Sequence, residues 1–127
     1  ILLIDDSEEL HLFIKACLKQ TVREVTCVKS GLEALEHIKT NKYDLILLDM
    51  QMPEMNGYET AQKIREYEHK EKLIPVPILA LSGAVMREEI ENSISAGCNE
   101  FQSKPIKKAE IIERVKRMLT SRAESIN

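Results

Sequence analysis

The feature that most constrains the fold is the regular alternation of short apolar runs with segments of helical periodicity. Continuous apolar runs occupy residues 1–4, 45–48 and 78–81, and apolar residues at intervals of three and four follow each run. Each run is too short for a helix and long enough for a strand. No low-complexity stretch or Gly/Ser-rich linker interrupts the alternation. This pattern is typical of a parallel sheet covered by helices.

The ends of the helices are indicated by capping and turn residues. The predicted boundaries are Ser7 as the first N-cap, Ser30 with Glu33 as a capping box for 31–39, a third start near Tyr58, and Gly97 as the fourth end. We expect the third helix to fade into the charged stretch 66–72, which should be solvated surface. Val22, Val25 and Val28 suggest the second strand, and Phe101 lies in a short fifth strand.

Helical spacing of apolar residues predicts which side chains face the core. The expected buried stripes are Leu10, Phe13, Ile14, Cys17 and Leu18 in the first helix, Leu32, Leu35 and Ile38 in the second, Ala61 and Ile64 in the third, and Ile111, Ile112, Val115, Met118 and Leu119 in the last. Five strands alternating with five helices predict a single domain over 1–127 of the α/β class, a (βα)5 doubly wound fold. Its five-stranded parallel sheet is expected in the order 2-1-3-4-5, with helices on both faces.

Charge and cysteine content exclude several classes of function. The net charge of −3 is small and unsegregated, so we expect no binding of nucleic acid by this chain. No apolar run approaches the roughly 20 residues that span a bilayer, so membrane insertion is not expected. The cysteines are far apart and never form a C-x-x-C pair, which favours buried thiols in a reducing, cytoplasmic setting.

Polar side chains follow four of the predicted strands at the point where each strand ends. They are Asp5 and Asp6 after 1–4, Asp49 after 45–48, Ser82 after 78–81, and Lys104 after the strand at Phe101. Ligands of open α/β sheets bind beyond the carboxyl ends of the strands. We therefore expect three carboxylates, a hydroxyl and an amine at one edge of the sheet.

Three neighbouring carboxylates repel one another unless a cation neutralises them. Because the ligands are hard oxygens and no Cys or His stands beside them, the pattern favours Mg²⁺, for which Mn²⁺ could substitute. Acidic residues after strands often only cap the next helix, and Ser82 before Gly83 could be a simple turn residue. Lys104 before Pro105 has no such capping role, so the combination favours a site. His11, His37 and His69 have no paired ligand and are expected to be surface or half-buried helix residues.

Four motifs, taken in order, carry a resemblance to a known family. They are Asp5-Asp6, the stretch Asp-Met-Gln-Met-Pro-Glu-Met-Asn-Gly at 49–57 after Leu-Leu, Ala-Leu-Ser-Gly at 80–83, and Lys104-Pro105. In this order and spacing they resemble the response regulator receiver domain of two-component signalling, over essentially the whole chain. The resemblance implies a flavodoxin-like fold and a signalling domain that catalyses only its own phosphorylation and dephosphorylation.

The resemblance also implies roles for individual residues. Asp49 would be the nucleophile that takes a phosphoryl group from a phosphohistidine of a histidine kinase or a histidine phosphotransfer protein. Asp6 and Asp49 would bind Mg²⁺ directly together with the backbone carbonyl of Gln51, and Asp5 would act through a metal-bound water. The implied phosphate-binding residues are Lys104, Ser82, Gly83 and Met50.

A switch and an output face are implied in the same way. Ser82 would move toward the phosphoryl group and let Phe101 turn inward, which alters the face formed by the fourth helix, the fifth strand and the fifth helix. A downstream protein would bind this face. A cis peptide bond is expected between Lys104 and Pro105. The 49–57 stretch resembles receivers of hybrid histidine kinases somewhat more than those of transcription factors. The chain begins without Met, so we expect it to be cut or trimmed from a longer protein, with no output domain in the sequence given.

Three alternatives remain open at this point. A haloacid-dehalogenase-type phosphatase also uses an Asp nucleophile, but it places a second Asp two residues later, where this chain has Gln51, and an amide cannot act as an acid or base. A flavodoxin-like cofactor carrier would need a first loop that cradles phosphate, whereas this loop is acidic and would repel it. The third alternative is a receiver-like scaffold that works without phosphorylation.

Overall fold

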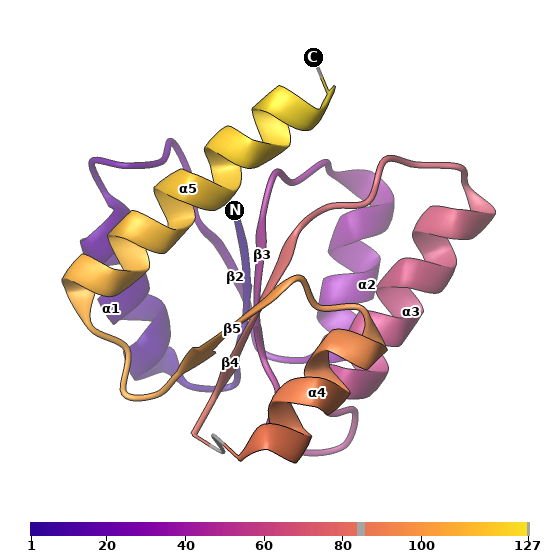
Figure 1. The fold of residues 1–127 in the computed structure, drawn as a ribbon, viewed down its shortest axis with the longest axis horizontal. Coiled ribbons are helices and arrows are strands. Elements are labelled where there is room, and N and C mark those ends of the chain that lie inside the picture. The colour runs from indigo at the N-terminus through magenta and orange to yellow at the C-terminus, as the bar shows by residue number, and fades with distance from the viewer. Residues whose placement is uncertain (84–85, 127) are drawn as a thin grey trace.

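The computed structural model describes residues 1–83 and 86–126. Five parallel strands form one sheet in the order β2-β1-β3-β4-β5. The strands are β1 (Leu2–Ile4), β2 (Thr26–Val28), β3 (Ile46–Asp49), β4 (Ile78–Ser82) and β5 (Glu100–Ser103), and the helices are α1 (Glu8–Leu18), α2 (Gly31–Thr40), α3 (Gly57–Lys70), α4 (Arg87–Ala96) and α5 (Lys108–Ile126). Figure 1 shows the strands running through the centre of the molecule. The predicted fold class and strand order are confirmed.

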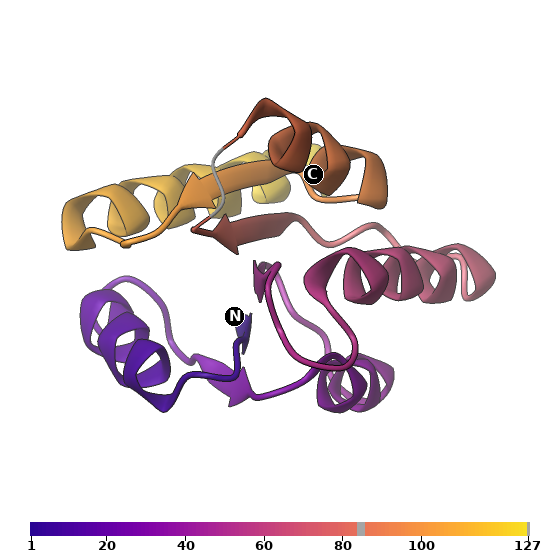
Figure 2. The same cartoon turned by 90° about the horizontal axis from the view of Figure 1, so that it is seen from below.

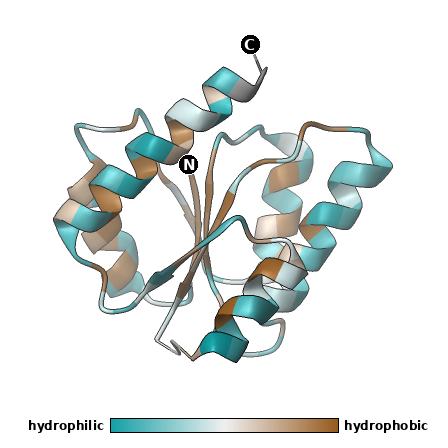
Figure 3. Ribbon diagram, in the orientation of Figure 1, coloured by the Kyte–Doolittle hydropathy of each residue, from teal (hydrophilic) through white to brown (hydrophobic). Residues whose placement is uncertain are grey.

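The helices cover the two faces of the sheet. Helices α1 and α5 pack on one face, and α2, α3 and α4 lie on the other, as Figure 2 shows. Alternate strand residues supply the two cores, since successive side chains of a strand point to opposite faces. Leu2 and Leu48 belong to the core beneath α2 and α3, and Leu3 and Leu47 to the core beneath α1 and α5. The hydrophobic colour is accordingly concentrated in the central strands (Figure 3).

One strand boundary and two packing predictions were wrong. Strand β2 begins only at Thr26, so Val22 and Val25 precede it rather than belonging to it. This strand lies at the edge of the sheet and pairs only with β1, so its pattern is not fixed by neighbours on both sides. Phe13 of α1 is 40% exposed and Leu32 of α2 is 58% exposed. Ala34 is fully buried in α2 instead of Leu32.

The charged stretch 66–72 is not merely solvated surface. Helix α3 continues to Lys70, and the side chain of Glu68 is buried. Its two carboxylate oxygens accept from Arg65 Nη1 at 2.6 Å and from the Val76 amide at 2.7 Å. Arg65 also donates from Nε to the Gly97 carbonyl at 3.0 Å and from Nη2 to Asn99 Oδ1 at 2.9 Å. This network attaches the C-terminal end of α4 to α3, and Gly97 ends α4 in the left-handed region with φ 117°, as expected of a helix-ending glycine.

Arg65→Ala should lower the free energy of unfolding by about 2–3 kcal/mol, because it leaves the buried Glu68 carboxylate without its cationic partner. Arg87→Ala is the matched control. It breaks an exposed pair with Glu91 four residues on and should cost no more than about 0.5 kcal/mol. Urea denaturation of the metal-free proteins measures both. Equal losses in the two variants would show that the buried network is no more stabilising than a surface ion pair.

Among the residues that the structure describes, no helix combines the length and the apolar character needed to cross a bilayer.

Candidate functional site

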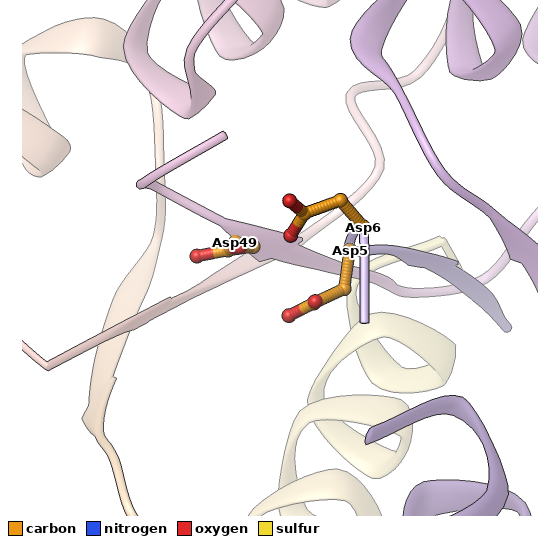
Figure 4. Close-up of side chains that lie close together, drawn as sticks. All are labelled: Asp5, Asp6 and Asp49. Carbon is orange, nitrogen blue, oxygen red and sulfur yellow. The ribbon is translucent and has the colours of Figure 1, made fainter. Parts of the chain in front are cut away.

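The carboxyl ends of β1 and β3 bring three acidic side chains together. Asp5 and Asp6 follow β1, and Asp49 is the last residue of β3. One oxygen of each carboxylate lies within 4.8 Å of the others. Figure 4 shows the three side chains gathered at these strand ends. Asp5 and Asp49 are buried, whereas Asp6 is exposed, so the cluster opens to solvent on the side of Asp6.

Lys104 places its ammonium against the two buried carboxylates. Its Nζ lies 3.2 Å from Asp5 Oδ2 and 3.4 Å from Asp49 Oδ1. The residue is positioned from both sides: its amide donates to the Ser82 carbonyl at 2.8 Å, and the peptide bond to Pro105 is cis, as the resemblance predicted. Lys104 therefore neutralises part of the negative charge that the strand ends concentrate.

Burial and neighbouring charges shift the pKa values of both Asp49 and Lys104. Burial raises the pKa of Asp49, the hydrogen bond from the Gln51 amide lowers it, the neighbouring Asp5 raises it and Lys104 lowers it, with a raised pKa as the net result. Burial alone would lower the pKa of Lys104, but the attraction of Asp49 and Asp5 outweighs it and the pKa is raised. Lys104 is therefore charged at neutral pH, and ionised Asp49 is held at an energetic cost.

This cost predicts a pH-dependent effect of Asp49→Asn on stability. A carboxyl whose pKa is raised by folding ionises more easily in the unfolded chain, so folding loses stability as the pH rises through the folded-state pKa. In a metal-chelating buffer, the variant should therefore gain stability over wild type as the pH rises from about 4 to about 7. Urea denaturation at several pH values measures the difference. A difference that does not change with pH, or that shifts in favour of wild type as the pH rises, would contradict the raised pKa.

Gln51 was expected to contribute only its backbone carbonyl, yet two other groups of this residue contact the site. Its amide donates to Asp49 Oδ1 at 3.0 Å, and its side-chain Oε1 accepts from the Gly83 amide at 3.3 Å. The first contact could have been anticipated, because Asp side chains commonly accept from the amide two residues later. The second joins loops that are distant in sequence. This hydrogen bond occupies the Gly83 amide, and the resemblance assigns Gly83 to phosphate binding.

Met50, which the resemblance assigns to phosphate binding, has its backbone amide engaged in the sheet. Its side chain is buried, and its amide donates to the Leu81 carbonyl at 3.0 Å within the pairing of β3 and β4. A donor held in the sheet is not available to a phosphate in this conformation. The Gln51 amide, which already faces the Asp49 carboxylate, is the neighbouring backbone donor that is directed at the site.

The predicted switch residues lie on adjacent strands, two positions apart in the register of the sheet. Ser82 is the last residue of β4 and is buried, and Phe101 of β5 pairs with Ala80 in the register of the sheet. Phe101 is partly buried and packs against the core beneath α2, α3 and α4. The movement of Ser82 and Phe101 that the resemblance implies stays a prediction.

His11 is buried rather than exposed or half-buried. Its Nε2 lies 2.6 Å from the Asp5 carbonyl oxygen. Because a carbonyl can only accept, Nε2 carries the proton. The imidazole thereby fixes the backbone beside the acidic cluster, a role that a lone His on a helix does not reveal in the sequence.

Gly57 allows α3 to begin very close to the site. Its amide donates to the Met50 carbonyl at 3.3 Å, and a Cβ at this position would lie 2.5 Å from Met50 Cα and 2.6 Å from the Asp49 carbonyl oxygen. Real Cβ atoms do not approach backbone atoms so closely. The absence of a side chain at residue 57 therefore determines the path of the loop that follows Asp49.

Comparison with known proteins gives a consistent result. The sequence model of the response regulator receiver domain matches residues 1–116. Hybrid signal transduction histidine kinase L of Dictyostelium discoideum is 41% identical over 121 residues, which are 92% of this chain and 7% of that protein. The sensor histidine kinase GacS of Pseudomonas protegens is 31% identical over 115 residues, 91% of this chain and 12% of that protein. The chain thus spans a small part of the relatives that it matches.

Solved structures agree in fold. The receiver domain of the Francisella response regulator 1452 superimposes with a TM-score of 0.84 at 28% identity, covering 94% of this chain and 95% of that one. The receiver domain of sensor histidine kinase PA1611 from Pseudomonas aeruginosa, solved with a magnesium ion in its active-site cleft, has a TM-score of 0.81 at 32% identity and covers 94% and 95% of the two chains. These matches do not support the phosphatase and cofactor-carrier alternatives. With the sequence match over 1–116, they show that this chain belongs to the response regulator receiver domain family of two-component and phosphorelay signalling.

Proposed function

We propose that Asp49 is the phosphoryl acceptor of this receiver domain. The supporting observation is the position of its carboxylate at the end of β3, 3.4 Å from the Lys104 ammonium and beside two further carboxylates. A carboxylate at neutral pH needs no general base, so the task of the site is to position the donor and balance charge. One Asp49 oxygen forms the new bond to phosphorus while the bond to the donor's imidazole nitrogen breaks, and that nitrogen keeps the electron pair.

The donor set fits a divalent metal with a preference for oxygen ligands. Asp6, Asp49 and the Gln51 carbonyl would hold Mg²⁺, for which Mn²⁺ could substitute, and Asp5 would contribute through a water. The buried pair of Asp5 and Asp49 needs more positive charge than one ammonium provides, which is the observation of this structure that favours a cation here. When bound, the ion supplies charge neutralisation at the transferring phosphoryl oxygens.

Lys104 and the β4–α4 loop would receive the transferred group. The ammonium of Lys104 would exchange its contact with Asp49 for one with a phosphoryl oxygen, and Ser82 and the Gly83 amide would donate to the others. For Gly83 this requires release of Gln51 Oε1, which its amide contacts in this structure. Movement of Ser82 would then permit Phe101 to turn inward.

The partners are proposed from the same site and from the relatives. The donor is a phosphohistidine of a histidine kinase or of a histidine phosphotransfer protein, and we propose that this domain works in the cytoplasm. The downstream protein would bind the face formed by α4, β5 and α5. The output signal is the change in this face, so the domain modifies no substrate other than itself.

The direct test is the intact mass of the protein after incubation with acetyl phosphate. We expect a gain of one phosphoryl group in the presence of Mg²⁺ and none with a chelator. Borohydride reduction followed by peptide mass spectrometry locates the modified residue, which should be Asp49. No gain with acetyl phosphate or with phosphorylated histidine donors would overturn the proposal and favour a scaffold that works without phosphorylation.

Lys104→Ala should slow phosphorylation by acetyl phosphate on the order of 100-fold, because the transferring oxygens lose a fixed positive charge. Mg²⁺ binding, measured by calorimetric titration, should be retained, since the variant removes a cation that competes for the same carboxylates. Lys107→Ala, which removes an exposed lysine three positions further on, is the control and should react at the wild-type rate. A rate for Lys104→Ala equal to that of the control would exclude Lys104 from the reaction.

A further inference from the structure

A concave site lies at the opposite end of the sheet from the acidic cluster. It is a cavity of about 490 Å³ between the C-terminal ends of α2 and α3, the starts of β3 and β4, and the last part of α5. Its apolar lining includes Ile38, Ile46, Ile64 and Val76, with Tyr43 and Tyr67 as aromatic walls. The volume lies within the range of about 300–1,000 Å³ that is usual for small-molecule sites.

The charged groups that line the cavity are mainly cationic, although the chain as a whole carries a net charge of −3. Lys39, Lys42, Lys72 and Arg122 all line it. The one acidic lining residue, Glu68, is buried, and both of its oxygens already accept hydrogen bonds. Within the described part of the chain, the three lysines form no ion pair. Their positive charges are therefore not balanced by the protein.

The lysines are not needed to cap the helix ends beside them. Cations near a helix C-terminus commonly serve the last carbonyl groups. Here the His37 carbonyl of α2 accepts from the Asn41 amide at 2.9 Å, and in α3 the Tyr67 carbonyl accepts from the Glu71 amide at 3.0 Å. The backbone satisfies these carbonyls itself. The lysine ammoniums at the cavity are thus available for another anion.

Arg122 adds a positioned donor from α5. Its Nη1 donates to the Pro75 carbonyl at 2.9 Å, which fixes the side chain across the cavity edge. Its Nε is buried and forms an ion pair with Asp44 Oδ1 at 3.5 Å, but it makes no hydrogen bond among the described residues. A buried donor without a hydrogen-bond acceptor is unusual in a folded protein. Leu73 and Ile74, which are 46% and 61% exposed, extend the apolar surface at the rim.

We propose that this cavity binds a small amphipathic anion, with an apolar body between the two tyrosines and a carboxylate or sulfonate at Lys42, Lys72 and Arg122. The apolar floor excludes a simple inorganic anion as the preferred ligand, and the cationic rim disfavours an amine. The site is independent of the phosphoryl acceptor, because the two occupy opposite ends of β3 and β4.

An NMR titration of the ¹⁵N-labelled domain with 4-phenylbutyrate tests the proposal. The neutral 4-phenylbutanol and the cationic 4-phenylbutylamine share the apolar body and differ in charge. We expect saturable shifts of the amides of residues 38–46 and 64–76, with the carboxylate binding about tenfold more tightly than the alcohol and the amine most weakly. Added salt should weaken the binding of the carboxylate more than the binding of the alcohol, because salt screens only the ionic contact.

Charge-reversal variants separate binding in the cavity from binding elsewhere. Lys42→Glu combined with Lys72→Glu should abolish the preference for the carboxylate while preserving the spectrum of the folded domain. Lys63→Glu is the matched control, since it reverses an exposed lysine of α3 that does not line the cavity. The proposal is wrong if no saturable shifts appear, if the amine binds as tightly as the carboxylate, or if the double variant binds like the control. It is also wrong if the same amides shift with protein concentration alone, which would identify a contact between two copies of the domain.

Discussion

Asp49→Asn is expected to reduce phosphorylation by acetyl phosphate or by a phosphohistidine donor to an undetectable level. The substitution keeps the size of the side chain and an oxygen that can accept from the Gln51 amide at 3.0 Å, so the local backbone is preserved. It removes the negative oxygen that attacks phosphorus, and an amide oxygen is a far weaker nucleophile than a carboxylate. Since Asp5 and Asp6 remain, a failure to react would not be due to loss of the whole cluster. Intact mass measures the result.

Asp44→Asn provides the control for this prediction. The side chain of Asp44 is 78% exposed, and the residue lies before β3 rather than after it. Asp44 is therefore a carboxylate at the end of the strand opposite to the acidic cluster. This variant should gain a phosphoryl group as wild type does. A modified Asp49→Asn protein would show that another carboxylate accepts the group. Peptide mass spectrometry would then decide between Asp5 and Asp6.

Gly57→Ala is expected to lower the free energy of unfolding by about 2–3 kcal/mol, because the added methyl group meets backbone atoms that cannot move independently. The conflicting atoms are Met50 Cα and the Asp49 carbonyl oxygen. If α3 moves away to relieve the contact, the loop after Asp49 moves with it. We therefore also expect slower phosphorylation in the fraction of the protein that remains folded.

Gly83→Ala is the matched control for Gly57→Ala. A Cβ at residue 83 would have Gln51 Oε1, at 3.8 Å, as its nearest neighbour, an ordinary contact. The free energy of unfolding of Gly83→Ala should stay within about 0.5 kcal/mol of the wild-type value. Urea denaturation of both variants measures the difference. Similar losses would mean that glycine is required at both loops for a reason other than close approach.

The arrangement of the sheet and the location of the site could be predicted from the sequence because both depend on local patterns. The fully apolar runs at 45–48 and 78–81 can only be strands that are covered on both faces, and the residues after them must then meet at one edge. The structure places β3 and β4 within one residue of these runs. Asp49 and Ser82 were recognised because each ends an apolar run, and Lys104 because it follows the fifth strand directly before Pro105.

The remaining features depend on contacts between segments that are distant in sequence. A charged residue such as Glu68 looks like surface until Val76 and Arg65 are known to enclose it. The hydrogen bond between Gln51 and Gly83 is equally invisible, since 32 positions separate the two residues. Phe13 and Leu32 were misplaced for a different reason. Each lies next to another apolar or small residue on its helix, and periodicity alone cannot decide which of two neighbours faces the core.

The uneven attachment of α4 has a mechanical consequence. Its C-terminal end is fixed by Gly97 and by the hydrogen bonds of Arg65, and its buried residues, Ser93 and Ala96, lie in the same half. Its first turn has Met86 as the N-cap residue, with no side-chain cap, and Met86 is 71% exposed. A helix attached in this way can pivot about its C-terminal end at Gly97. A displacement of Ser82 and Gly83 that reached α4 would therefore change the tilt of the helix axis more than its position.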